Sequence, residues 1–171
     1  MGIRRFEKFD HAIADCNRAI ELDPKHPAAY NLRGNVYVNM EQYDPAIEDH
    51  NKTIEIAPNN ATTYHNRGSA YNNMGNHGLA IEDYTKAIEI DPKSAAHYVN
   101  RGNTYRNRGN KDLAIQDYCK AIELDPKETS VYDLRSRMYR IEDPSMTIID
   151  IRNNKQYMDE LRQNIENIVL F

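Results

Sequence analysis

Histidine and cysteine are the side chains in this sequence best suited to bind a metal or to act as nucleophiles, but their spacing favours neither role. The six histidines stand at unrelated positions and form no His-x3-His pair, so no metal site is expected. Cys16 and Cys119 lie far apart without a metal-type partner, which favours free thiols. The glycines do not cluster into a phosphate-binding loop. We therefore expect no enzyme activity and no cofactor.

Amides and phenols are the polar groups that the chain has in excess. Its 171 residues include 19 Asn and 12 Tyr, whereas Leu, Ile, Val and Phe together number only 33. An asparagine side chain both donates and accepts hydrogen bonds, so a row of asparagines can bind groups of either kind. A low count of large aliphatic residues signals disorder when the net charge is high, but here the net charge is −4. Disorder is therefore not expected.

Charge and hydropathy exclude two classes of partner. The chain has 22 basic and 26 acidic residues and a pI of about 5.9, so it offers no net basic surface to nucleic acid. No apolar run approaches the roughly 18 residues of a membrane span, and residues 1–8 lack the apolar core of a signal peptide. We expect a cytoplasmic protein that binds neither nucleic acid nor membranes.

The elements that position these side chains follow from an internal repeat of 34 residues. Four similar segments end in prolines at this spacing, which are Pro24, Pro58, Pro92 and Pro126. A tyrosine, an arginine and a glycine keep the same period, as Tyr30, Arg33 and Gly34, then Tyr64, Arg67 and Gly68, then Tyr98, Arg101 and Gly102, with a weaker copy at Tyr132, Arg135 and Ser136. Complete repeats therefore run over 27–60, 61–94 and 95–128.

Each repeat contains two helical patterns. In the first, Tyr64, Gly68 and Tyr71 recur at the spacing of one helix face. After a break at 74–76, Ala80 and Tyr84 begin a second such face, and the proline that ends each repeat stops that helix. Every repeat is thus predicted to be a hairpin of two helices.

These residues resemble the tetratricopeptide repeat, whose pattern is an aromatic, Leu-Gly and Tyr, then Ala and Phe, then Pro. The matching residues in one repeat are Tyr64, Gly68, Tyr71, Ala80, Tyr84, Ala87 and Pro92. The resemblance implies an all-α fold, a right-handed solenoid of stacked antiparallel helix pairs. It also implies that the first helices line a concave groove.

The two ends of the chain depart from the repeat. Residues 1–26 supply a partial first repeat, mainly its second helix, whose uncovered apolar face indicates either a fragment or a neighbour that covers it. Residues 129–143 are expected to form the first helix of a degenerate repeat. Residues 144–171 form a different amphipathic pattern that we interpret as a C-terminal capping helix, because repeat arrays need an end with a polar outer face.

An arginine stands before the glycine of each repeat, where the resemblance implies leucine, and on the buried side of the first helix it needs an acidic partner. Aspartates recur at the same period. Pairing within a repeat would leave Asp15 and Arg135 alone, whereas pairing each aspartate with the arginine 18 residues later leaves none. We therefore predict pairs between repeats that fix their register. These are Asp15–Arg33, Asp49–Arg67, Asp83–Arg101 and Asp117–Arg135.

Nine asparagines fall on one face of the first helices, opposite the tyrosine and glycine face. They are Asn31, Asn35, Asn39, Asn66, Asn72, Asn73, Asn100, Asn103 and Asn107. Asparagine is a mediocre helix former, so neutral drift explains this excess less well than a function does. We predict that this asparagine face binds a peptide of a partner protein, with Arg106 adding local positive charge.

The family's carboxylate clamp for acidic chaperone tails is disfavoured, because Ala96 and Asn100 stand where the clamp would require cations. The chain is thus predicted to be a protein–protein interaction scaffold whose partner is an unidentified protein or peptide. A second hypothesis also stands, in which the chain is a structural module that self-associates, as a homodimer through its exposed first repeat or through the apolar C-terminus.

Overall fold

The computed structural model describes residues 3–140, which fold into eight α-helices without any strand. The helices are α1 (Ile3–Leu22), α2 (Pro27–Asn39), α3 (Tyr43–Ile56), α4 (Ala61–Asn73), α5 (His77–Ile90), α6 (Ala95–Asn107), α7 (Lys111–Leu124) and α8 (Thr129–Arg140). This architecture confirms the predicted all-α, helical-repeat class. The expected capping helix at 144–171 lies outside the described residues.

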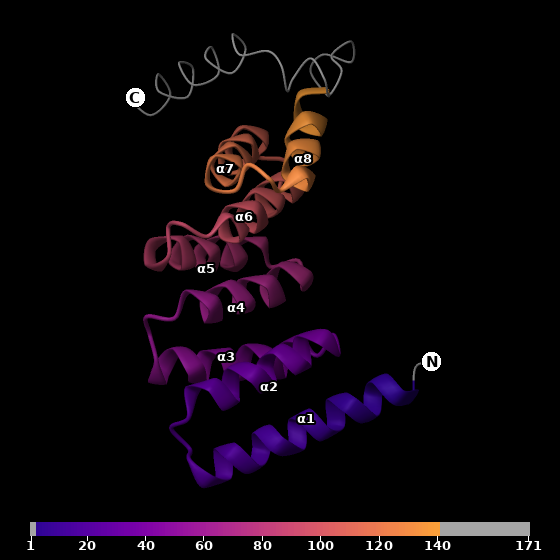
Figure 1. The fold of residues 1–171 in the computed structure, drawn as a ribbon, viewed down its shortest axis with the longest axis vertical. Helices are drawn as coiled ribbons and strands as arrows, with labels where there is room; N and C mark the ends of the chain where they lie inside the picture. Colours follow the sequence, from indigo (N-terminus) through magenta and orange to yellow (C-terminus); the bar gives the residue numbers. More distant parts are fainter. Residues whose placement is uncertain (1–2, 141–171) are drawn as a thin grey trace. The chain divides into compact units, whose positions relative to one another are not determined.

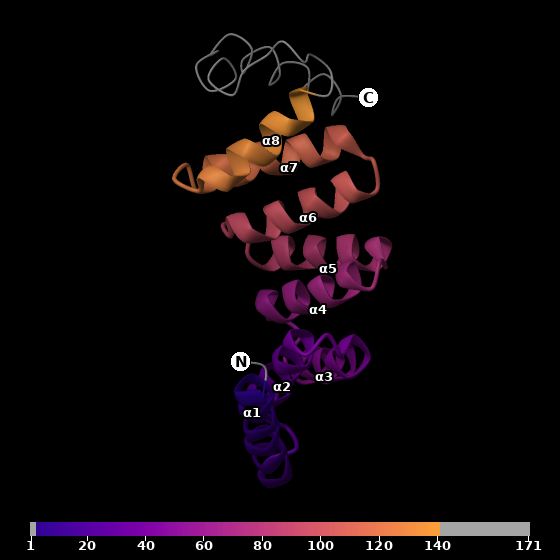
Figure 2. The same ribbon diagram turned by 90° about the vertical axis from the view of Figure 1, so that its right-hand side faces the viewer.

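The helices belong to two compact units, an N-terminal unit whose described part is residues 3–93 and a C-terminal unit whose described part is 94–140. In the N-terminal unit, α2 packs against α3 and α4 against α5, and α1 packs on α2 as α3 packs on α4 (Figures 1 and 2). In the C-terminal unit, α6 pairs with α7, and α8 packs on α7. Each 34-residue repeat is therefore one helical hairpin.

The turns within the hairpins depend on a residue with positive φ at the same place in each repeat. Gly75 and Gly109 have φ values of 79° and 78°, which glycine adopts without steric cost. In the first complete repeat this place is taken by Glu41, with φ of 60°. At the start of α4, the Asn60 side chain accepts a hydrogen bond from the backbone of Thr63 and caps the helix.

A glycine of the first helix faces a ring of the second helix in every complete repeat. A Cβ atom added to Gly68 would lie 3.1 Å from Cε1 of Tyr84, and one added to Gly102 would lie 2.9 Å from Cε1 of Tyr118. Both tyrosines are buried. The absent side chain therefore sets how closely the two helices approach.

The first complete repeat places a histidine where the others have this tyrosine. His50 is fully buried against Gly34, and both of its ring nitrogens lack a hydrogen-bond partner among the described residues. The tyrosine hydroxyls of the other repeats are bonded, Tyr84 with Ser69 and Tyr118 with Asn103. Burial, with the nearby Arg67 charge, lowers the pKa of His50 from 6.5 to about 4.

Replacing the glycine in this contact should destabilise the protein. In Gly68→Ala, the new methyl group would crowd the Tyr84 ring, and we expect the free energy of unfolding to fall by about 1–3 kcal/mol in urea denaturation. Gly78→Ala is the matched control, because no described residue outside its own stretch of helix has an atom within 4 Å of a Cβ added to that helical glycine. The control should be neutral or gain up to about 1 kcal/mol. Equal losses in both variants would contradict the close-approach explanation.

His50 should make the protein acid-sensitive. Since its pKa in the folded state lies below that in the unfolded chain, its contribution is complete above about pH 6.5 and is lost as the pH falls towards 4, up to about 3 kcal/mol. His50→Tyr restores the residue of the other repeats and should remove this loss when stability is measured from pH 7 to 4. Replacing the exposed His11 by Gln should leave the loss in place.

Candidate functional site

In each of the three complete repeats, the arginine of the first helix pairs with the aspartate of the second helix. Arg33 donates from Nε to Asp49 Oδ2 at 2.8 Å and from Nη2 to Oδ1 at 2.6 Å. The same two-bond geometry joins Arg67 to Asp83 at 2.8 and 2.6 Å, and Arg101 to Asp117 at 2.9 and 2.8 Å. The predicted pairs between repeats, Asp15–Arg33, Asp49–Arg67 and Asp83–Arg101, are therefore wrong, and Asp117 likewise bonds Arg101 rather than Arg135.

The reason for this error is that one guanidinium serves two helices. While Nε and Nη2 hold the carboxylate of the same repeat, Nη1 of Arg33 donates to Asn17 Oδ1 at 2.5 Å, and Nη1 of Arg67 donates to Asn51 Oδ1 at 2.6 Å. Asn17 and Asn51 belong to the second helix of the preceding repeat. The contact that crosses between these repeats is thus made by an amide, two residues after the aspartate that the sequence suggested.

Asp15 and Arg135 differ from their counterparts in the complete repeats. The Asp15 side chain is exposed. Arg135 is 3% exposed, and its Nε has no partner among the described residues, while its Nη1 lies 3.6 Å from Cys119 Sγ. Equal numbers of repeated arginines and aspartates in the sequence therefore do not mean that every one of them forms a pair.

Tyrosines on the first helices flank each guanidinium. The Arg67 guanidinium carbon lies 5.6 Å from the ring centre of Tyr64 and 6.0 Å from that of Tyr71, distances at which a cation is attracted to an aromatic face. The hydrogen bond to Asp83 raises the pKa of Arg67, so the guanidinium stays charged. In the C-terminal unit, burial raises the pKa of Asp117, and the hydrogen bond from Arg101 opposes that rise. The first-helix tyrosines therefore hold the arginine in place.

The nine predicted asparagines differ in exposure along the first helices. Three of them, near the helix C-termini, are exposed: Asn39, Asn73 and Asn107. The other six are half-buried: Asn31, Asn35, Asn66, Asn72, Asn100 and Asn103. The position of an asparagine on the helix face predicts the direction of its side chain but not how deeply that side chain is buried.

Two asparagines connect neighbouring first helices in the N-terminal unit. Asn66 of α4 donates from Nδ2 to Asn35 Oδ1 of α2 at 2.8 Å. One turn earlier on α2, Asn31 has a buried Oδ1 without a partner among the described residues. This corner of the asparagine face therefore holds two linked amides beside a buried amide oxygen that no described residue bonds.

Two other asparagines are used inside their own hairpins. Asn72 Oδ1 lies 3.1 Å from Nδ1 of His77 at the start of α5, and Asn103 Oδ1 accepts a hydrogen bond from the Tyr118 hydroxyl at 2.9 Å. Arg106 lies near the same hydroxyl, where its charge opposes the larger effect of burial, which raises the pKa of Tyr118. These amide oxygens and Arg106 serve the packing of the hairpin as well as its surface.

Asn100 lines a cavity in the C-terminal unit. The cavity has a volume of about 320 Å³ and lies between α6 and the start of α8. Ala96 and Val99 of α6 and Val131 of α8 form apolar walls, and Asp125 and Glu128 add carboxylates. The cavity is large enough for a few side-chain or backbone groups of a ligand.

Within residues 3–140, histidine, cysteine, aspartate and glutamate side chains form no group of three or more that could hold a metal ion. None of the helices described is both long and apolar enough to cross a membrane.

Comparison with known families places the chain in a helical-repeat family. The Tetratricopeptide repeat model matches residues 27–60, 61–94 and 95–128, and a second TPR repeat model matches 7–41. The chain belongs to the tetratricopeptide repeat family, and its fold is a tetratricopeptide-type solenoid. A comparison of the sequence with curated proteins finds no match.

Several solved structures share this fold. A crystal structure of MamA has a TM-score of 0.78 at 23% identity and covers 100% of this chain and 99% of its own. The first TPR domain of Spaghetti (RPAP3), bound to the HSP90 peptide SRMEEVD, has a TM-score of 0.65 at 23% identity, over 67% of this chain and 91% of its own. The Arabidopsis OM64 TPR domain has a TM-score of 0.63 at 26% identity, over 66% and 93%.

A double-mutant cycle should confirm which aspartate pairs with Arg67. We expect Arg67→Ala and Asp83→Ala to couple by about 1–3 kcal/mol in the free energy of unfolding, because each single change leaves a largely buried charge behind. The control cycle combines Arg67→Ala with Asp49→Ala and should give less than about 0.5 kcal/mol. Stronger coupling to Asp49 would contradict the observed geometry.

Proposed function

We propose that this protein is an interaction scaffold that binds an extended peptide of a partner protein on its asparagine face. The observation that carries the proposal is the Asn35–Asn66 hydrogen bond between α2 and α4. That bond uses the oxygen of Asn35 and one donor of Asn66, so the Asn35 amide nitrogen and the Asn66 oxygen can still bond a ligand.

The chemistry of this face suits a peptide backbone. An extended backbone presents both N–H donors and C=O acceptors, and each asparagine amide can satisfy either. Because the amides are neutral, they recognise the backbone without demanding charged side chains. The Asn35–Asn66 bond also fixes two side chains before the ligand arrives, which reduces the entropy that binding costs.

The same face disfavours an acidic tail as ligand. The Spaghetti domain is bound to the HSP90 peptide SRMEEVD, which has three acidic residues among its last four. Here Ala96 and Asn100 line a cavity together with the carboxylates of Asp125 and Glu128. Like charges would repel an acidic peptide at this cavity, so a peptide that binds this part of the C-terminal unit is neutral or basic.

Binding to the backbone can be tested with an array of 12-residue peptides. For the best binder, we expect Asn35→Ala and Asn66→Ala each to weaken the Kd by about tenfold, because about 1.4 kcal/mol of hydrogen bonding is lost. Asn59→Ala, at an exposed asparagine in the loop before α4, is the control and should leave the Kd unchanged. Asn100→Ala tests the C-terminal unit in the same way.

Methylation of backbone nitrogens in the same peptide separates backbone from side-chain recognition. If the asparagine amides form hydrogen bonds with the peptide backbone, N-methyl groups at alternate peptide residues should abolish binding. Replacing the peptide side chains that point away from the protein should change the affinity little. Binding that survives N-methylation, or that is unaffected by the loss of Asn35 and Asn66, would refute the proposal.

A further inference from the structure

One residue of each second helix faces the arginine of the following first helix, and its chemistry changes along the chain. In the N-terminal unit this residue is Asn17 or Asn51, whose side-chain oxygen accepts from Nη1 of the arginine at 2.5 and 2.6 Å. Two 34-residue repeats after Asn51, the same register holds Cys119 of α7, which faces Arg135 of α8. A sulfur atom therefore stands in the C-terminal unit where the N-terminal unit has an amide oxygen.

Arg135 is a buried cation that lacks the strong acceptors of the earlier arginines. Its side chain is 3% exposed, and its Nε has no partner among the described residues. Its Nη1 points at Cys119 Sγ from 3.6 Å, and a thiol is only a weak acceptor. The ring of Tyr132, with its centre 5.5 Å from the guanidinium carbon, attracts the charge but accepts no strong hydrogen bond. A buried donor without a good acceptor costs stability and calls for an explanation.

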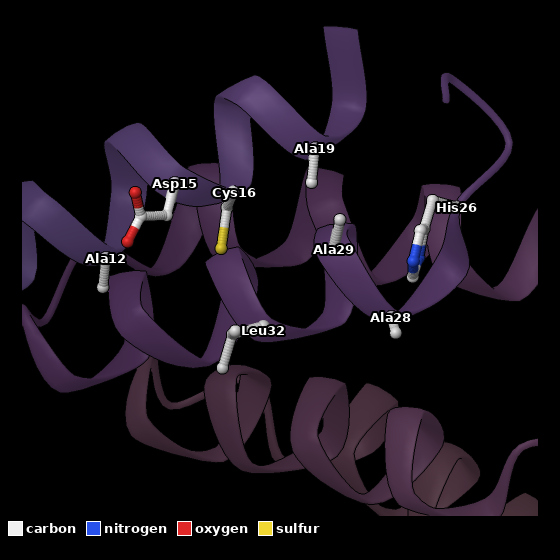
Figure 3. Close-up of a pocket in the computed structure, with 8 residues that line it drawn as sticks. All are labelled: Ala12, Asp15, Cys16, Ala19, His26, Ala28, Ala29 and Leu32. Carbon is white, nitrogen blue, oxygen red and sulfur yellow. The ribbon is translucent and has the colours of Figure 1, made fainter. Parts of the chain in front are cut away.

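The two cysteines of the chain have different surroundings. Cys16 of α1 is 4% exposed, and its thiol points toward α2 (Figure 3). Burial raises the pKa of that thiol, which makes it a poor nucleophile at neutral pH. Cys119 is only half-buried and lies against a guanidinium. A partly exposed thiol beside a cation is the kind of cysteine that small oxidants modify.

We propose that Cys119 is a site of reversible oxidation, where a peroxide converts the thiol to a sulfenic acid whose oxygen accepts a hydrogen bond from Arg135. The thiolate sulfur attacks one oxygen of hydrogen peroxide, so that an S–O bond forms as the O–O bond breaks. The sulfur loses two electrons, which the peroxide gains. The hydroxide that leaves takes a proton from solvent and becomes water.

The added oxygen restores at Cys119 the acceptor that Asn17 and Asn51 provide in the N-terminal unit. The Nη1–Sγ distance of 3.6 Å is longer than the Nη1–Oδ1 distances of 2.5 and 2.6 Å, which leaves room for an oxygen bonded to the sulfur. A hydrogen bond from a guanidinium is strong because its donor is charged. Oxidation therefore strengthens the contact between α7 and α8 instead of disrupting it.

A chemical trap tests whether Cys119 is the oxidised residue. The reduced full chain is treated with a small excess of hydrogen peroxide and with dimedone, which reacts with sulfenic acids, and its peptides are analysed by mass spectrometry. We expect dimedone on Cys119 and at least about tenfold less on Cys16, because the second thiol is buried. Dithiothreitol added in place of dimedone should return the oxidised chain to its original mass. Equal labelling of both cysteines, no label on Cys119, or an oxidised mass that dithiothreitol does not remove would overturn the proposal.

Hydrogen exchange tests whether the new oxygen bonds Arg135. Oxidation should slow exchange of the α8 amides by about fivefold, which corresponds to one added hydrogen bond between α7 and α8. Cys119→Asn, which restores the residue found at Asn17 and Asn51, should give the same protection without peroxide. Cys119→Ala should give none, and neither variant should respond to peroxide at α8.

Two arginine variants of α8 complete the test. In Arg135→Gln, oxidation of Cys119 should no longer slow the exchange of α8. In the control Arg137→Gln, at an exposed arginine of the same helix, oxidation should slow exchange as it does in the wild type. Faster exchange of α8 after oxidation, or equal exchange in the Asn and Ala variants of Cys119, would overturn the proposal even if Arg135→Gln does not fold. These measurements use no peptide ligand, so their outcome is independent of the asparagine face.

Discussion

In each complete repeat, one arginine of the first helix donates two hydrogen bonds to one aspartate of the second, and a glycine beside it lets the helices approach a buried ring. The two contacts depend on each other. Tyr84 follows Asp83 in the sequence, and Gly68 follows Arg67. The distance between the two helices that Gly68 permits is therefore also the distance at which the Arg67 guanidinium reaches the Asp83 carboxylate. The rings of the tyrosines that flank the arginine attract its charge, which offsets part of the free energy lost when the guanidinium leaves water.

This arrangement explains the composition of the chain. A family position that is usually leucine is arginine here, so each hairpin holds a polar cluster where hydrophobic packing would be expected. Tyrosine suits that cluster in two ways. The rings of the first-helix tyrosines attract the cation, and the hydroxyls of Tyr84 and Tyr118 on the second helices bond Ser69 and Asn103. His50 replaces the tyrosine, and no described residue bonds its ring nitrogens. Protonation of His50 therefore makes the stability of this repeat depend on pH.

The sequence predicts the helices and their class well, because the 34-residue period and the helix faces are local patterns. It predicts the partners of the charged groups poorly. Register alone cannot tell whether Asp49 or Asp83 lies closer to Arg67, and counting pairs gave the wrong answer because a guanidinium has donors for two neighbours. The sequence does contain a signal for the contact between repeats, because Asn17 and Asn51 stand 34 residues apart. The asparagine face shows the same limit, since a helix face does not show that Asn72 and Asn103 bond within their own hairpins.

The most direct test of this account is side-chain ¹⁵N NMR of the arginines in single aspartate variants. If each pair lies within its repeat, Asp49→Asn should shift the Nε–H signal of Arg33 and speed its exchange with water, while the Arg67 signal stays in place. Asp83→Asn should do the same to Arg67. A shift of Arg67 in Asp49→Asn, with Arg33 unchanged, would place the pairs between repeats and contradict the central claim.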